Sequence, residues 1–436
     1  MSDADLTQRV YREFGPGPLS SDQEDLYVDL AAVRGDMDAV RRLAKRIRYA
    51  EGAPTCQVLA GHNGSGKSTE LFRLKRQLET NDSPLFVVYV TAKKGDLNDI
   101  DFPDLLILLV QQMAAQLKED AGITLAPGYF GKRLERLKEI LTSEINFNSF
   151  ELASDLGKIG GEIKGSPNAR SRIRELLEPD TGNLLNAAND VIGEAVAKLN
   201  KKGKKGIVIL MDDLDKMVVR QHSTGCGTDE YLFVNRAAQL TAFRCHVVYT
   251  IPISLAYSHH ESMISSNYGG DVPVVPMTKV AKRPPESGPD ESGMGKFAEI
   301  IELRLKKAQT TKDEVFENDD VRNELISLSG GQPTELMTLV REAIITDDLP
   351  ITKETLKRAV VEGCREYARQ LRADHWPIIN QIRKDGNYIR TSQTEPVFRE
   401  LLNSRAILQY VNDGIWYGLN PMVAKLTPPD KDIALP

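Results

Sequence analysis

The feature that most constrains this chain is a glycine-rich stretch from Gly61 to Thr69, which fits the pattern G-x-x-x-x-G-K-[ST]. Glycines without side chains let a loop wrap closely around a polyphosphate, with its backbone N–H groups pointing inward. The apolar run Cys56–Ala60 before it predicts a buried strand, and residues 68–78 after it predict a helix. The positive end of that helix would favour a bound anion. The stretch therefore predicts a phosphate-binding loop, with an ordinary glycine-rich turn as the alternative.

Two side chains of this loop have specific expected roles. Lys67 is expected to reach the β- and γ-phosphates of a nucleotide, and the Ser68 hydroxyl to ligate Mg²⁺. The expected ligands are therefore ATP and Mg²⁺. The expected loop contacts to the nucleotide are Gly61, His62, Asn63, Gly64, Ser65, Gly66, Lys67, Ser68 and Thr69.

Length and composition limit the remaining choices. A chain of 436 residues is too long for one ordinary core, so two or three domains are expected. The net charge of −6 gives no general attraction to nucleic acid. Four scattered cysteines fit reduced thiols, and the strongest apolar run, Leu105–Val110, is far below the ~20 residues that cross a bilayer. We therefore expect a cytoplasmic protein that is not inserted in a membrane.

Five apolar or β-branched runs separated by helical patterns predict an α/β fold with a mainly parallel sheet. A long helical insertion, about residues 98–200, lies between the second and third runs; within it, residues 145–165 fit either two short strands or an amphipathic helix. The five predicted strands are Cys56–Ala60, Leu85–Thr91, Gly206–Met211, Cys245–Ile251 and Val272–Met277.

The rest of the chain reads as helices followed by a hairpin. Residues 406–410 and 415–418, joined by a turn at 412–414, predict the hairpin, and with the helices before it they suggest a winged-helix domain. The predicted organisation is an N-terminal arm or loop (1–24), a P-loop NTPase core (25–280), a flexible loop (281–295), a helical lid (296–365) and a winged-helix domain with a tail (366–436).

A second motif follows the third predicted strand. Its apolar residues end in Asp212 and Asp213, which places two carboxylates at the carboxyl edge of the sheet. Nucleotide hydrolysis needs one carboxylate to hold Mg²⁺ and another group to orient water, so we assign Asp212 the metal and Asp213 the water. A solvated acidic turn is the alternative, and Asp215 with Lys216 could form a local structural pair.

Together these motifs resemble the AAA+/STAND group of ATPases over about residues 25–420. The resemblance implies that the fourth strand lies between the two motif strands and that Thr250 at its tip senses the γ-phosphate. Thr250 as an ordinary strand residue is equally compatible with the sequence. Arg34, in the adenine-side segment of the family, would contact the nucleotide or else form a surface ion pair.

The lid segment distinguishes the subfamilies. Gly331–Pro333 fits the Gly-x-Pro motif of STAND switches, in which the proline packs near the adenine; alternatively, Pro333 only starts a helix. Remodelling AAA+ ATPases have an arginine there, whereas Thr334 follows here. The segment 255–271, where an arginine finger is expected, contains no arginine, and Arg236 and Arg244 are weak substitutes. Since a finger accelerates hydrolysis by roughly 10³–10⁵, turnover should be slow.

The resemblance implies a slow ATPase that acts as a nucleotide-operated switch and changes its conformation or assembly with the bound nucleotide. The assembly would be a nucleotide-dependent homo-oligomer. A separate sensor or effector protein is the expected partner, in a setting such as bacterial phage defence. The alternative is an initiator or loader that binds DNA through its winged helix, and a third is a scaffold that never hydrolyses. Two basic stretches remain, a helix at 36–49 and the run Lys201–Lys205. We interpret both as solvated surfaces, with nucleic-acid contact as the less favoured alternative.

Overall fold

The computed structural model describes residues 3–20, 23–35, 38–80, 84–135, 137, 141, 150–412 and 414–428. By internal packing the chain divides into two units. The sheet unit comprises Ala39–Ala60 and Glu70–Pro273, and the loop unit comprises Met1–Asp38, Gly61–Thr69 and Val274–Pro436. The phosphate-binding stretch thus groups with the C-terminal part of the chain.

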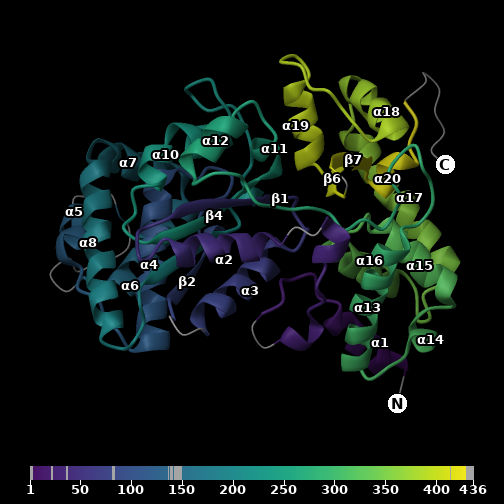
Figure 1. The fold of residues 1–436 in the computed structure, drawn as a ribbon, viewed down its shortest axis with the longest axis horizontal. Helices are drawn as coiled ribbons and strands as arrows, with labels where there is room; N and C mark the ends of the chain where they lie inside the picture. Colours follow the sequence, from purple (N-terminus) through teal and green to yellow (C-terminus); the bar gives the residue numbers. More distant parts are fainter. Residues whose placement is uncertain are drawn as a thin grey trace. The chain divides into compact units, whose positions relative to one another are not determined.

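The fold is α/β, as predicted (Figure 1). Its sheet has the strand order β2-β3-β4-β1-β5. Strands β2, β3 and β4 pair in parallel, with Thr91 opposite Asp212 at the carboxyl end of the first pair. All six residues of β3 are buried, which explains its apolar sequence. Strand β4 lies between β3 and β1, as the family resemblance implied. The strands are β1 (Cys56–Gly61), β2 (Phe86–Thr91), β3 (Ile207–Asp212), β4 (His246–Pro252) and β5 (Val274–Val275).

Strand β5 is shorter than the predicted Val272–Met277. Pro273 and Pro276 stand on either side of it. A proline has no backbone N–H to donate to a neighbouring strand, so the ladder is limited to the two valines between them.

The predicted insertion between β2 and β3 is helical. Its ambiguous segment forms helix α6 (Leu152–Gly165), while residues 145–149 lie outside the described part. Helix α4 packs against α6, α8 and β2. The helices here are α4 (Phe102–Ala121), α5 (Gly128–Leu134), α7 (Pro167–Leu177) and α8 (Thr181–Asn200). The others associated with the sheet are α2 (Ala39–Tyr49), α3 (Lys67–Glu79), α9 (Thr228–Glu230), α10 (Ala237–Leu240), α11 (Ile253–Ala256) and α12 (Glu261–Asn267).

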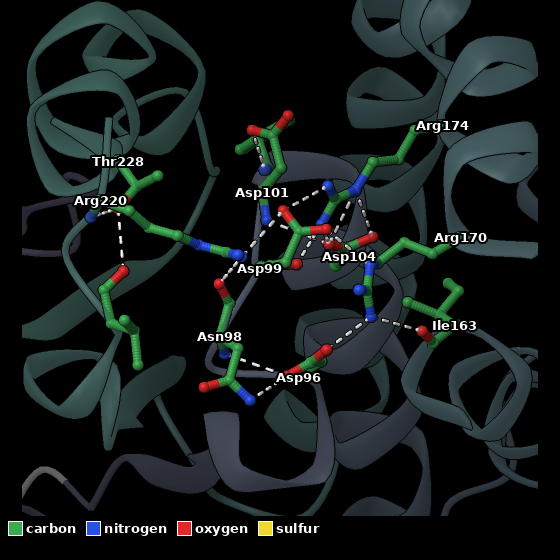
Figure 2. A network of polar contacts seen from close by, with 12 residues as sticks. Asp96, Asn98, Asp99, Asp101, Asp104, Ile163, Arg170, Arg174, Arg220 and Thr228 are labelled. Atoms are coloured by element: carbon green, nitrogen blue, oxygen red, sulfur yellow. Dashed lines mark hydrogen bonds and ion pairs between the residues drawn. The ribbon is translucent and has the colours of Figure 1, made fainter. Parts of the chain in front are cut away.

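A charged network fastens α7 to the segment between β2 and α4 (Figure 2). Arg170, whose side chain is 5% exposed, donates to Asp96 at 2.7 Å and to Asp99 at 2.9 Å. Arg174 bonds both Asp99 and Asp104. Burial alone would raise the pKa of Asp99, but the two guanidinium groups lower it. The insertion is thus anchored to the chain that leaves β2.

The loop unit is mainly helical. Its first residues form helix α1 (Asp3–Glu13), which corrects the expectation of an arm or loop there. Val10 and Phe14 are fully buried, and Arg9 donates to the carbonyl of Ala308. The other helices are α13 (Glu291–Lys307), α14 (Lys312–Val315), α15 (Asp319–Leu328), α16 (Pro333–Thr346), α17 (Lys353–Gln370), α18 (Trp376–Asp385), α19 (Glu395–Asn403) and α20 (Pro421–Ala424).

The predicted C-terminal hairpin is present as antiparallel strands β6 (Ile407–Val411) and β7 (Ile415–Leu419). Tyr410 and Trp416 stack with ring centroids 4.3 Å apart, and they form a buried cluster with Met277 and Leu408. Met277 N also donates to Gln409 O at 3.0 Å. These contacts tie the hairpin to the chain that follows β5.

Two general expectations can be checked on the described residues. No helix among them is long and apolar enough to cross a bilayer. All four cysteines are unbridged thiols, as expected from their spacing.

The charged network predicts a local loss of stability when Arg170 is replaced. Arg170→Met leaves the Asp96 and Asp99 carboxylates without their shared guanidinium, which should cost about 2 kcal/mol in this partly exposed setting. Hydrogen exchange in α7 should then accelerate roughly 30-fold at constant pH. Arg172→Met, an exposed position on the same helix, is the matched control. Equal exchange in the two variants would show that the network does not hold α7.

Candidate functional site

The phosphate-binding stretch joins β1 to α3, as predicted. Its glycines take backbone conformations that other residues rarely adopt, with φ of 153° at Gly61 and 86° at Gly64. A side chain at Gly61 would place its Cβ 2.7 Å from Val275 O. One at Gly64 would lie 3.2 Å from Thr334 Cβ. The loop thus needs glycine both for its backbone shape and for the close approach of its neighbours.

Lys67 begins helix α3 and turns back onto its own loop. Its Nζ donates to Gly61 O at 2.7 Å and to His62 O at 2.6 Å, and the side chain is buried. Ser68 follows in the first turn of the helix, and Thr69 Oγ1 accepts from Leu19 N. The ammonium group therefore lies inside the loop, in contact with backbone carbonyls.

Arg34 is buried and holds the loop from a distant part of the sequence. It donates to Ser65 O at 2.7 Å and to Thr278 Oγ1 at 3.1 Å. The surface ion pair considered from the sequence is therefore wrong, because only 4% of this residue is exposed. A cation fixed on the loop backbone adds to the positive potential of the loop, which suits an anionic ligand.

The segment before α16 also lies against the loop. Thr334 N approaches Gly64 O at 3.4 Å, and Gly331 O accepts from Thr278 N. Gly331 has φ of 74°, and a Cβ there would clash with the Thr278 carbonyl. Pro333 is the first residue of α16, as its helix-start reading predicted. The Gly-x-Pro motif thus packs against the phosphate-binding stretch within one unit.

His62 connects the same loop to the C-terminal hairpin. Gln409 N, in β6, donates to His62 Nε2 at 2.9 Å, and both residues are buried. Burial and the charges of Lys67 and Arg405 lower the pKa of His62 to about 3. The ring is therefore neutral near pH 7, which keeps Nε2 available as an acceptor.

In the sheet unit, Asp212 and Asp213 are both buried at the carboxyl end of β3. Asp212 accepts from Tyr89 Oη at 2.5 Å and from Asp213 N at 2.7 Å. Asp213, with φ of 70°, accepts from Lys216 Nζ at 2.6 Å and Thr91 Oγ1 at 2.6 Å, and pairs with Lys93 at 3.1 Å. The carboxylate predicted to orient water is thus held by two lysines.

These partners determine the charge of Asp213. Burial alone would raise its pKa, but hydrogen bonds from Lys216 and Thr91, with the Lys216 charge and a bond from Lys93, lower it. Lys216 pairs with Asp213, and the nearby Asp215 charge, which the sequence also suggested as its partner, helps to raise the pKa of Lys216.

The structure shows a structural role for Thr250. Its buried hydroxyl accepts from Leu214 N at 3.1 Å, which fixes the chain just after Asp213. Thr250 therefore supports the acidic turn as well as its strand.

The sequence offered two substitutes for an arginine finger. Arg236 pairs with Glu178 and Asp101, whereas Arg244 is exposed.

The polar groups around the loop fit a phosphate. Ser65 Oγ and both polar atoms of the Gln332 amide are buried and have no hydrogen-bond partner among the described residues. Buried polar atoms of this kind are usually satisfied by a ligand or water. No cluster of three or more His, Cys, Asp or Glu that could hold a metal occurs in the described part of the chain. Mg²⁺ commonly takes only one or two protein ligands beside phosphate oxygens, so this finding is compatible with it.

Sequence reasoning missed the residues that reach these motifs from elsewhere. Thr278 and Gln409 hold Arg34 and His62, and Tyr89, Thr91 and Lys93 hold the two aspartates. Thr91 and Lys93 had a usable signal, because they are polar residues at the carboxyl end of a predicted parallel strand. Thr278 and Gln409 carried no such signal.

Comparison with known proteins gives little further information. No protein-family model matches the chain, and no curated protein matches it. Among solved structures it is similar to the Walker-type ATPase PABY2304 of Pyrococcus abyssi, with 14% identity, a TM-score of 0.43 and coverage of 94% of this chain and 98% of that one. A similarity with this TM-score does not assign a function to the chain. The candidate site is therefore described from its own geometry.

The buried His62 predicts a pH-dependent stability of the loop unit. With a folded pKa of about 3 and an ordinary value of 6.5, the unfolded chain takes up a proton that the folded chain excludes. Stability is therefore complete above pH 6.5 and falls as the pH drops toward 3, by up to about 1.4 kcal/mol per pH unit. His62→Gln keeps an acceptor for Gln409 N but does not titrate.

Urea unfolding followed by tryptophan fluorescence measures this, because Trp376 and Trp416 both belong to the loop unit. At pH 7.5 the wild type should be the more stable protein, and its advantage should shrink at pH 5.5. A difference that stays constant over this range would contradict a neutral buried His62.

Proposed function

We propose that this protein is an ATP-binding, slowly hydrolysing switch of the STAND type within the AAA+ group. The supporting observation is that the phosphate-binding loop contacts both the segment before α16 and strand β6 within one unit. On this proposal α13 to α17 act as the lid, and α18, α19 and the hairpin as a winged-helix domain. Pro333 would lie near the adenine, and Arg34 would support the nucleotide side of the loop.

Lys67 is the group that couples nucleotide binding to the loop. It now donates to Gly61 O and His62 O, so binding the β- and γ-phosphates requires it to exchange those carbonyls for phosphate oxygens. His62, whose ring accepts from Gln409 N, belongs to the same loop. A change of loop backbone at His62 is therefore a change in the attachment of the hairpin.

The remaining residues have roles in hydrolysis. Ser68 and Asp212 would hold Mg²⁺, which when bound neutralises charge on the phosphates. Tyr89 and the backbone of Asp213 keep the Asp212 carboxylate in one orientation. Asp213 would orient water once the water has replaced Lys216 or Lys93 as a partner of its carboxylate. Thr250 would sense the γ-phosphate.

The proposed partner is a separate sensor or effector protein that reads the released hairpin, for example in bacterial defence against phage. A nucleotide-dependent homo-oligomer is a second way to transmit the change. Both follow from the resemblance to STAND switches, and the cytoplasm is the proposed location.

The switch predicts that ATP loosens the hairpin. Hydrogen exchange of residues 406–411 should accelerate at least about tenfold when ATP and Mg²⁺ are added, because His62 no longer holds Gln409 N. In Lys67→Met the addition should have no effect, since loss of the charge-assisted bonds lowers ATP affinity about 100-fold. Unchanged exchange in a wild-type protein that demonstrably binds ATP would exclude this coupling.

The assignment of Asp213 predicts a separation of binding from hydrolysis. Asp213→Asn should bind ATP within about threefold of wild type, yet hydrolyse it roughly 100-fold more slowly, because the amide is a poorer acceptor for the attacking water. The neighbouring Asp215→Asn variant is the control, measured by steady-state phosphate release with melting temperature as a check of folding. Equal turnover in the Asp213 variant and wild type would move the water-orienting role elsewhere.

A further inference from the structure

A cavity of about 690 Å³ lies in the sheet unit, away from the carboxyl ends of its strands. Its lining includes Leu85 just before β2, Ile207 at the start of β3, and Cys245 and His246 at the start of β4. In a parallel sheet these amino ends lie on one edge. The edge carrying Asp212 is five residues along β3, or about 17 Å away.

The cavity has an apolar floor and a basic rim. Ile47, Ile207 and Cys245 in its lining are buried. The exposed cations Arg48, Lys205 and Arg244 also line it. Each cation comes from a different segment: the end of α2, the chain before β3 and the chain before β4.

The charge balance of the lining favours an anion. Among the described residues of the lining, Glu51 is the one carboxylate, against the three cations. Burial lowers the pKa of His246, whose Nδ1 lies 2.9 Å from Thr55 Oγ1, so the positive charge comes from the rim. Arg48 uses one guanidinium nitrogen on Gln77 O, and the Arg244 side chain has no polar partner among the described residues. An arginine has five N–H donors, so both retain donors for a ligand.

The two basic stretches that the sequence left unexplained therefore contribute to one site. Arg48 belongs to the basic helix, and Lys205 to the Lys201–Lys205 run. Arg42 and Lys202, from the same stretches, lie outside the lining: Arg42 pairs with Asp271, and Lys202 donates to Ala121 O.

We propose that this cavity binds a small phosphorylated ligand with an apolar or aromatic body, of the size of a mononucleotide, independently of the phosphate-binding loop. Its volume falls within the roughly 300–1,000 Å³ of small-molecule sites. The rim binds the phosphate, and the floor covers the ring. A polynucleotide would need a track of cations along its backbone, whereas these three surround one hollow.

The test uses AMP as the probe and the full-length Lys67→Met protein as the background, so that the phosphate-binding loop does not contribute. Isothermal titration should detect AMP binding to this protein. Reversing two rim charges, Lys205→Glu with Arg244→Glu, should lower the affinity at least about tenfold. The matched control, Lys118→Glu with Arg172→Glu, reverses two exposed charges outside the lining and should leave AMP binding within about twofold.

A second variant tests the cavity without changing charge. Val196, on α8, lines the hollow, and Val196→Trp should fill it and lower AMP affinity at least about tenfold while the rim stays intact. No AMP binding to the background protein, or unchanged binding in Val196→Trp, would overturn the proposal.

Three comparison ligands fix the chemical class. Inorganic phosphate should bind more weakly than AMP because it leaves the floor uncovered, and octanoate should bind more weakly because it lacks the phosphate charge. Equal or tighter binding of either would overturn the assigned class. Single-stranded DNA that binds through the same rim residues, while AMP does not, would replace the small ligand with a nucleic acid.

Discussion

The hydrogen bond from Gln409 N to His62 Nε2 is the contact on which the proposed behaviour of this protein depends. It joins a phosphate-binding loop to a strand almost 350 residues later in the chain, and it exists only while the ring is neutral. Arg34 and Thr334 attach the loop to two further segments of the same unit. A ligand that reshapes the loop backbone would therefore also change its contacts with these segments.

Much of the fold could be predicted because its signals are local. Four strands are runs of mostly apolar or β-branched residues, and a continuous apolar run such as Ile207–Met211 is typical of a strand buried on both faces. Helix α1 was missed because its sequence is mostly polar; Val10 within it and Phe14 just after it are fully buried. Its helical state depends on packing against α13 and α16, which no short window of sequence contains. Strand β5 was overextended because the valines suggested a strand more strongly than the flanking prolines limited it.

The residues of the candidate site also fall into two groups, those with a local sequence signal and those without one. The loop glycines, Lys67 and the Asp212–Asp213 pair are motif residues with fixed spacing, so the sequence identifies them. Their partners are set by topology: Tyr89 reaches Asp212 because β2 is the parallel neighbour of β3, and Thr278 reaches Arg34 only in the folded loop unit. Residues that position a motif are drawn from any element that the fold brings near, and hence leave no pattern in the sequence.

In the proposed mechanism, the state of Asp213 is a second physical reason to expect slow turnover, separate from the segment without an arginine. Its carboxylate accepts from Lys216 and Thr91 and pairs with Lys93, so each oxygen already has a donor. The same donors lower its pKa, which makes it a weaker proton acceptor. To orient water, as proposed, Asp213 would have to give up a lysine at a buried position, and that exchange would add to the barrier of each turnover. In this proposal the insertion helices would act on the exchange, because Lys93 belongs to the segment that α7 holds through Asp96 and Asp99.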